Sequence, residues 1–514
     1  MLAASALLAV LGALVVWPVA SVALLAAPRA VLVPHAAEIV LATLTLAGIS
    51  TAVTVLLALV VASGATRADV PGRRLVGGLG LVPLAAPPYV AALAVALFVR
   101  DAGAPGRALG LGGLEGLPGL VLAQVLSFLP PAFTRLTGVL RAIDPELERA
   151  AESLGARRPA VFRHITLALA RPGVGSTALV IFVLCLGDFA TPFVLGGDYR
   201  VLSTEIYAAA LQGGDATSAA ALASVLLLPC LAAFALGGRW REVWASAVVA
   251  AAPPLLPRPT RPIIRWTLGV VSLLTAAAVA ATYAALPLGA LARRWGSDWS
   301  PSGRHFVLPP SAAAALGTSV ELALVAGLAG TALALATAYV VERRAGPGRR
   351  LIERLSVLPA ALPGGVVGLG YLVGFGAAFW TLAAAVVAWA LPAGVHLAVG
   401  AVRRVGPELE EAAESLGARR RSIVRHITAP LVARPAGAIF VHFAVIALVT
   451  VSAVVFLAVP GREPASVMVL TAAARGDLGG ACALATLVLA LAVAAALLGR
   501  APAGGRRQPR PRGR

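Results

Sequence analysis

Long apolar segments constrain the fold of this chain more than any other feature of its sequence. A helix of about 20 apolar residues can cross a bilayer, and a backbone inside lipid must satisfy its own hydrogen bonds. Twelve segments meet this requirement: residues 2–26, 39–63, 76–99, 117–140, 174–195, 217–237, 266–290, 312–341, 353–376, 379–402, 435–459 and 478–499. The sequence therefore predicts an all-α polytopic membrane protein, with its first segment kept as a membrane helix rather than removed as a signal peptide.

The basic residues predict which side of the membrane each connection faces. All 42 are arginine, and the formal net charge is +19. With a cytoplasmic N-terminus, 32 arginines lie on the cytoplasmic side, 9 lie outside and Arg135 lies within a span. Cytoplasmic connections of membrane proteins carry such an excess of basic residues, so we expect both termini to be cytoplasmic. No aromatic–basic pattern or binding fold accompanies the charge, and no nucleic-acid partner is expected.

A polar block of 21 residues occurs twice. ELERAAESLGARRPAVFRHIT occupies residues 146–166 and ELEEAAESLGARRRSIVRHIT occupies residues 408–428, with 16 identical positions at an offset of 262. Asp144, just before the first copy, is typical of a helix start, and Gly155 and Gly417 are typical of a helix end. Each block is expected to form two short helices joined at the glycine, where another protein docks from the cytoplasm.

The duplication extends over the whole chain. PGRR at residues 71–74 recurs at residues 347–350, an offset of 276. The same offset aligns prolines that we expect to kink or break the third and ninth spans: Pro83 with Pro359, and Pro87 with Pro363. Two parallel six-span halves with a path between them are therefore predicted. The expected units are a first half (1–237), a linker (238–265), a second half (266–499) and a basic, disordered tail at the membrane surface (500–514).

The repeated blocks resemble the EAA loop of permeases from binding-protein-dependent ABC importers. That pattern is E-A-A, three residues, G, nine residues, then I-x-L-P. The second copy matches it through Glu411, Ala412, Ala413, Gly417, Ile427 and Pro430. The first copy matches it through Ala150, Ala151, Gly155 and Ile165, with Arg149 in place of the glutamate. Arg149 leaves open whether both copies bind their partner equally well.

The resemblance implies a type I importer fold and two kinds of partner. In that family the loop is a coupling helix that sits in a cleft of the cytoplasmic ATPase dimer, and the corresponding segments here are 142–171 and 404–434. A periplasmic or lipid-anchored binding protein delivers the solute from outside. The family resemblance also implies residence in the cell inner membrane.

Two further phrases resemble the fused permeases of ferric-iron importers. They are GDFATPFVLGG at residues 187–197 and VTVSAVVFL at residues 449–457. The resemblance implies ferric iron as the solute, while phosphonate, thiamine, polyamine and sulfate permeases share much of these phrases and remain alternatives. An ion-gradient-driven secondary transporter fits the spans and the duplication equally well, but leaves the repeated block unexplained. A membrane scaffold or enzyme is a third reading.

Polar residues within the spans are the candidates for a solute path, because an unpaired polar group is costly in lipid. Asp188 lies late in the fifth span and aligns with Thr450 in the eleventh, with Ser452 two residues beyond. Glu321 in the eighth span, His442 in the eleventh and His396 in the tenth are the other candidates. The alternative for each is a structural partner at a helix interface.

No metal or nucleotide site is expected within this chain. The six histidines show no ligand spacing with cysteine or carboxylate, and the three cysteines lie in apolar spans. Without lysine there is no G-x-x-x-x-G-K-[ST] phosphate loop, and no Ser/His/Asp or HExxH arrangement suggests an enzyme. We therefore expect no cofactor here, and ATP with Mg²⁺ on a separate ATPase subunit.

Overall fold

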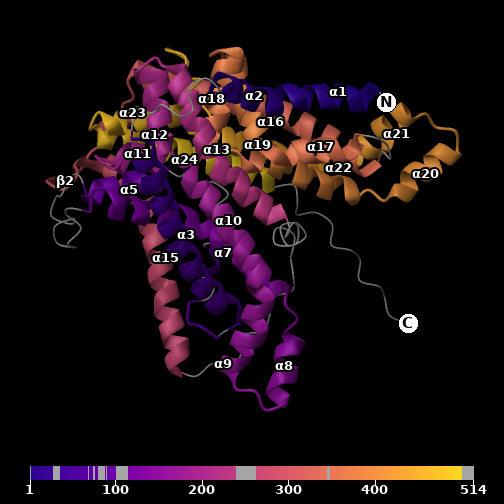
Figure 1. The fold of residues 1–514 in the computed structure, drawn as a ribbon, viewed down its shortest axis with the longest axis horizontal. Helices are drawn as coiled ribbons and strands as arrows, with labels where there is room; N and C mark the ends of the chain where they lie inside the picture. Colours follow the sequence, from indigo (N-terminus) through magenta and orange to yellow (C-terminus); the bar gives the residue numbers. More distant parts are fainter. Residues whose placement is uncertain are drawn as a thin grey trace.

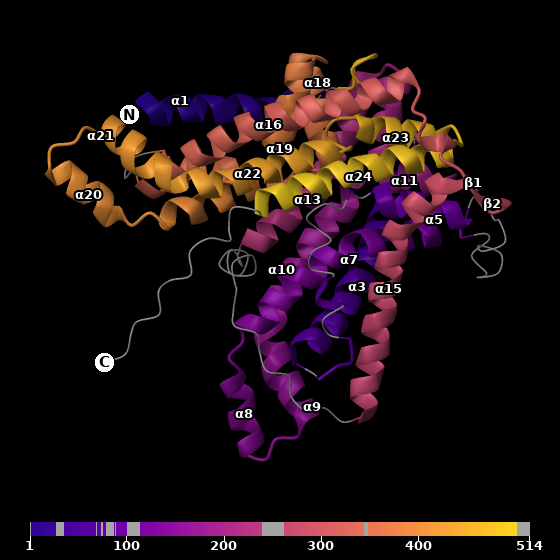
Figure 2. The ribbon, with the colours of Figure 1, turned by 180° about the vertical axis from the view of Figure 1, so that it is seen from behind.

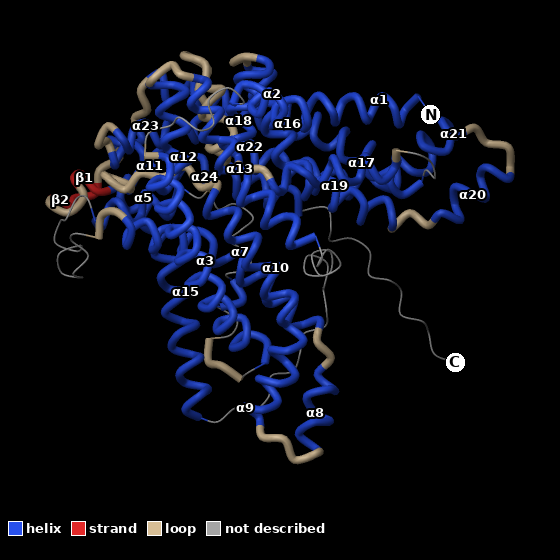
Figure 3. Tube along the Cα trace, viewed as in Figure 1, coloured by secondary structure: helices blue, strands red, loops and turns tan. Residues whose placement is uncertain are grey.

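The computed structural model describes residues 2–26, 35–67, 69–72, 76–78, 87, 89–99, 114–238, 262–343 and 348–500. Within these ranges the chain is almost entirely helical, as Figure 3 shows. The strands in the described part are β1 (Ala292–Arg294) and β2 (Asp298–Pro301), which pair antiparallel as one hairpin. The all-α fold predicted from the apolar segments is confirmed.

The helices follow the order of the predicted spans. Those of the first half are α1 Leu2–Leu11, η1 Gly12–Val16, α2 Trp17–Ala26, α3 Ala36–Arg67, α5 Tyr89–Val99, α7 Leu117–Ala142, α8 Pro145–Ser153, α9 Arg158–Val161, η4 Phe162–Thr166, α10 Leu167–Leu186, α11 Ala190–Leu195, α12 Leu202–Tyr207, η5 Ala208–Gln212 and α13 Ala216–Gly238. Those of the second half are α15 Pro262–Leu291, η6 Arg304–Phe306, α16 Pro310–Arg343, α17 Arg349–Val357, η7 Leu358–Ala361, α18 Gly364–Phe375, α19 Phe379–Arg403, α20 Pro407–Ser415, α21 Arg420–Ile423, η8 Val424–Thr428, α22 Ala429–Val449, α23 Ala465–Ala474 and α24 Leu478–Arg500.

Ten helices in the described ranges are long and apolar enough to cross a membrane, and they correspond to ten of the twelve expected segments. The ninth segment, 353–376, is not a continuous span, because α17 with η7 meets α18 at a bend of 112°. Pro363 causes this break, since it has no backbone N–H and restricts Leu362 before it to an extended conformation (φ −96°, ψ 124°). The predicted proline break in this span is confirmed.

The third segment also differs from a simple span. Of residues 76–99, only α5 forms a substantial helix in the described part, and its 11 residues are too few to cross a bilayer. Pro83, which was predicted to kink this segment, lies outside the described residues.

The fifth and eleventh spans begin and end earlier than predicted. The second helix of each repeated block does not stop, but runs through a π-helical turn into the span, so the continuous helices are Arg158–Leu186 and Arg420–Val449. The predicted ends at residues 195 and 459 are therefore wrong. The first of these helices stops before Gly187 and Asp188, and the second stops at the extended residue Thr450.

The long helices form two bundles that diverge from a common centre, as Figures 1 and 2 show from opposite sides. In the first bundle α3, α7 and α10 run together towards α8 and α9. In the second, α16, α19 and α22 run together towards α20 and α21. Each repeated block therefore lies at the far end of its own bundle.

The first span of each half packs on the other half. α2 lies against α18, where the Trp17 indole N–H donates to the carbonyl of Gly374 at 3.3 Å and the Tyr371 hydroxyl donates to the carbonyl of Leu14 at 2.7 Å. Conversely, α15 lies along α3 and α5 (Figure 2). The two halves defined by the sequence repeat are thus intertwined in space.

The second bundle packs around one aromatic side chain. Phe443 of α22 is fully buried, and it fits because α16 and α19 present Gly330 and Gly394 to its ring. A Cβ atom at either glycine would lie 2.4 Å from a ring carbon. Small residues that allow such close approach are a common basis of helix association in lipid.

Candidate functional site

Each repeated block forms an exposed helix pair at the end of its bundle, α8 with α9 and α20 with α21, called here the docking pairs. The turn between the helices lies at Gly155 and Gly417, whose φ angles of 87° and 81° are rarely adopted by residues with a side chain. The Asp144 carboxylate accepts the N–H of Glu146 at 2.9 Å and caps α8, whereas Gly406 offers α20 no side-chain cap. The predicted helix start and glycine turn are confirmed.

A leucine lies at the tip of each docking pair. Leu154 is 89% exposed and Leu416 is 88% exposed. Ion pairs lie beside them, with Arg158 Nε 3.8 Å from Glu152 Oε1 and Arg420 Nε 3.0 Å from Glu414 Oε1. The same leucine is thus exposed at the same place on both docking pairs, with an ion pair beside it in each.

The residues that match the EAA pattern are distributed over both sides of the docking pairs. The exposed ones are Arg149, Ala150, Glu411, Ala412 and Pro430, and the half-buried ones are Ala151, Ala413, Ile165 and Ile427. Arg149 against Glu411 is the single difference between the sequences of α8 and α20. Arg149 forms an exposed ion pair of 2.6 Å with Glu146, and such pairs add little stability.

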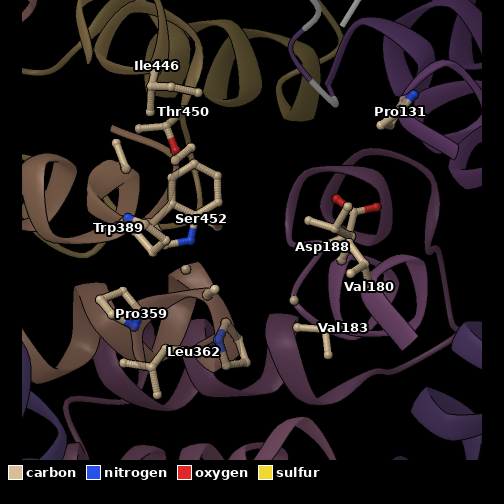
Figure 4. A pocket seen from close by; sticks show the side chains of 18 of the residues that line it. Pro131, Val180, Val183, Asp188, Pro359, Leu362, Trp389, Ile446, Thr450 and Ser452 are labelled. Atoms are coloured by element: carbon tan, nitrogen blue, oxygen red, sulfur yellow. The ribbon is translucent and has the colours of Figure 1, made fainter. Parts of the chain in front are cut away.

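A cavity of about 410 Å³ lies between the two bundles. The first half lines it with residues of α7, α10 and α13 and with Gly187–Ala190, and the second half with residues of η7, α19 and α22 and with Thr450–Ser452. Figure 4 shows Asp188 and Val183 on one side, and Thr450, Ser452 and Trp389 on the other. Asp188, Thr450, Ser452 and His442, singled out from the sequence, thus meet at one cavity.

Asp188 and Thr450 occupy equivalent positions, just after α10 in the first half and just after α22 in the second. The Ser203 hydroxyl donates to the Asp188 carbonyl at 2.9 Å, and the Ser466 hydroxyl donates to the Thr450 carbonyl at 2.7 Å. The side chain of Asp188 additionally accepts the Gln124 amide at 3.2 Å and the N–H of Thr191 at 3.3 Å. The long helix therefore ends at the equivalent place in both halves, but only the first half has a carboxylate there.

The other polar candidates differ in position. His442 lines the cavity, and its Nε2 lies 3.2 Å from the carbonyl oxygen of Ala390. Glu321 does not line it: its carboxylate pairs with Arg462 at 2.7 Å on an exposed part of α16. Among the described residues, no group of three or more His, Cys, Asp or Glu side chains is arranged to hold a metal ion.

Comparison with known proteins resolves the class of this chain. Residues 54–240 and 329–501 each match the family model described as the inner membrane component of binding-protein-dependent transport systems. The chain belongs to this family. The two matches fall on the two bundles, so this inner membrane component is present twice in one chain, which confirms the internal repeat and the resemblance seen in the EAA loops. With its ten candidate spans, it is a multi-pass inner membrane protein.

Three curated relatives of this transport component carry names of metal transporters. The chain is 28% identical to the ferric transport system permease protein FbpB of Actinobacillus pleuropneumoniae over 437 residues, which is 80% of this chain and 64% of the relative. It is 28% identical to the putative ferric transport system permease protein FbpB 1 of Haemophilus influenzae over 73% of this chain and 63% of the relative. A probable molybdenum ABC transporter permease of Haloferax volcanii is 31% identical over 35% of this chain and 66% of its own length. The chain thus spans less than two thirds of these relatives.

Sequence reasoning missed four charged residues that face inwards at the docking ends. Glu148 and Glu410 lie on the buried faces of α8 and α20, where they pair with the part-buried Arg67 and Arg343. The repeat contained the signal, since the two glutamates align at the offset of 262 and the two arginines at the offset of 276. Nothing in the local pattern indicated that these charges face inwards.

Proposed function

We propose that this chain is the permease of an ATP-driven importer, with both termini in the cytoplasm. The observation that carries the proposal is the pair of matching docking ends on two bundles that share one cavity. A cytoplasmic ATPase dimer would bind Leu154 and Leu416 at the two tips, and a binding protein would deliver the solute on the opposite face. ATP and Mg²⁺ would be bound by the ATPase, and this chain would bind no cofactor.

The arrangement of the bundles supports alternating access as the mechanism. The docking ends lie far out on diverging bundles (Figure 1), while the cavity lies where the bundles meet. When ATP closes the ATPase dimer, the docking ends are drawn together and the bundles rotate about their contact. A cavity lined by both halves then changes the side on which it opens.

We propose ferric iron as the solute. Similarity to two ferric transport permeases over most of this chain supports this choice. Selection of the solute would belong to the binding protein, because the described residues form no metal cluster. The deciding assay reconstitutes the chain in vesicles with its ATPase and measures ATP hydrolysis with binding proteins loaded with ferric iron, phosphonate, thiamine, polyamine or sulfate. If only a binding protein loaded with another solute stimulates ATP hydrolysis, iron is rejected as the solute. If an ion gradient drives uptake without ATP, the importer class is rejected.

The glycine turn of the second docking pair offers a test of whether this pair couples the permease to ATP hydrolysis. We expect Gly417→Val to abolish solute-stimulated ATP hydrolysis, because a β-branched residue is strained at a φ of 81° and the tip would be displaced. Gly437→Val is the matched control, since Gly437 lies on α22 and a Cβ atom there would have no neighbour within 4 Å. Equal stimulation in both variants would contradict the coupling role.

The carboxylate in the cavity offers a test of the solute path. We expect Asp188→Asn to lower uptake about tenfold while the ATPase still binds, because contacts to a charged group are commonly worth about 1.5–3 kcal/mol. Asp198→Asn, which removes an exposed carboxylate outside the cavity, is the control. Equal uptake by the two variants, measured with radioactive iron, would remove Asp188 from the path.

A further inference from the structure

The same buried ion pair lies beneath both docking pairs. Arg67 Nη1 lies 3.1 Å from Glu148 Oε1, and Arg343 Nε lies 3.4 Å from Glu410 Oε1. The glutamates are 4% and 9% exposed, in contrast to the exposed leucines at the tips nearby. Their charges therefore point into the protein and cannot form the outer surface that a partner touches.

A threonine completes each of these clusters. The Thr166 hydroxyl donates to Glu148 Oε1 at 2.7 Å, and the Thr428 hydroxyl donates to Glu410 Oε1 at 2.8 Å. Both threonines end the π-helical turn through which each docking pair continues into its long helix, α10 or α22. One carboxylate thus joins the exposed helix to the start of that span.

The arginine joins a third element to each cluster. Arg67 ends α3, and its Nη2 donates to the carbonyls of Leu140 at 2.6 Å and Ile143 at 3.2 Å, at the end of α7. In the second half, Arg343 at the end of α16 donates to the carbonyls at the end of α19 in the same way: Val402 at 3.1 Å, and Val405. Each cluster therefore connects the docking pair with three long helices.

The energetics of buried ion pairs indicate that these clusters fix the relative positions of the helices more than they strengthen the contact between them. Burying an ion pair costs several kcal/mol of desolvation, so an apolar contact of the same shape would hold the helices at least as well. An ion pair with hydrogen bonds to three elements instead permits a single arrangement. Glu148 and Glu410 are also the buried residues of the nine-residue helices α8 and α20, so the attachment of each exposed helix to its bundle depends on them.

We propose that Arg67–Glu148–Thr166 and Arg343–Glu410–Thr428 are couplers, which make each docking pair move as one body with three long helices of its bundle. These are positioning residues, and the inference rests on the proposed function. A docking helix without its coupler would follow the ATPase by itself, and the displacement would not reach the cavity. The coupler is thus required for transport, whereas the exposed tip is required for binding.

The test compares wild-type chain with the Glu148→Gln, Glu410→Gln double variant, in complex with the ATPase in vesicles. We expect the variant to insert and to retain the ATPase, while solute transported per ATP falls about tenfold, within the range typical of coupling between sites. The control is Glu342→Gln: Glu342 pairs with Arg403 at 3.0 Å, and this ion pair joins α16 to α19 at the same end without including the docking helix. The Glu342→Gln variant should leave the amount of solute transported per ATP unchanged.

A second measurement isolates the coupler from transport. Spin labels at Ser415 on α20 and Leu431 on α22, both exposed, should give a narrow distance distribution in the otherwise unchanged chain and a broad one with Glu410→Gln. The coupler proposal would be wrong if the glutamine variants left the ratio of solute to ATP unchanged, or if they left the distance distribution between the spin labels unchanged. It would also be wrong if the variants lost ATPase binding together with transport. A wild-type chain that binds no ATPase would overturn the proposed function, and the inference with it.

Discussion

The Leu154→Asp, Leu416→Asp double variant is expected to lose binding to the ATPase by at least about 100-fold, because an anchoring side chain at an interface commonly contributes about 2 kcal/mol. Both leucines are almost fully exposed, and they occupy the same position on the two docking pairs. An aspartate at each tip would remove the apolar anchor and bring an unpaired charge into the proposed contact with the ATPase. Co-purification of the ATPase and a titration of its binding to vesicles measure the loss.

Single variants separate the contributions of the two tips to ATPase binding, and a distant variant controls for the added surface charge. Leu154→Asp and Leu416→Asp alone each leave one tip intact, and comparing them shows whether Arg149 makes the first contact weaker than the second. Val307→Asp is the control, since Val307 is 79% exposed but precedes the start of α16, whereas the last residue of α16, Arg343, contacts the docking pair. Full binding of the ATPase by the double variant would show that the tips are not the contact.

Gly330→Leu is expected to prevent folding of the second bundle. A Cβ atom at Gly330 already lies 2.4 Å from the ring of Phe443, which is fully buried and also contacts Gly394. Overpacking of this kind costs about 3 kcal/mol or more, at the upper end of the usual range, because the added side chain meets a ring that is already fully buried. The expected result is loss of the monodisperse peak in detergent and of the thermal transition.

The matched control for this substitution lies on the same helix. Gly317 of α16 has no atom within 4 Å of a Cβ position, so Gly317→Leu should preserve the transition temperature. Equal transition temperatures for the two leucine variants would contradict the packing argument. A partial return of the transition in the Gly330→Leu, Phe443→Ala variant would support it, because the smaller side chain vacates the space.

Packing decided several features that local sequence signals could not. Asp188 belongs to the first half, whereas His442, Thr450 and Ser452 belong to the second, and they share one cavity only because the two bundles meet there. Glu321 is likewise a polar residue within an apolar segment, yet it pairs with Arg462 away from the cavity. A polar residue in an apolar segment indicates that it has a partner, but does not identify that partner.

The sequence by itself determined the membrane class, ten of the spans, the duplication, the proline break of the ninth segment, and the two docking pairs with their glycine turns. These features depend on hydrophobicity, capping and backbone freedom within a few residues, which are local properties. The tertiary structure alone decided that the first spans exchange between the halves and that Glu148 and Glu410 point inwards. Each of these depends on which distant helix comes into contact, and contact energies between helices in lipid do not appear in the pattern of any one segment.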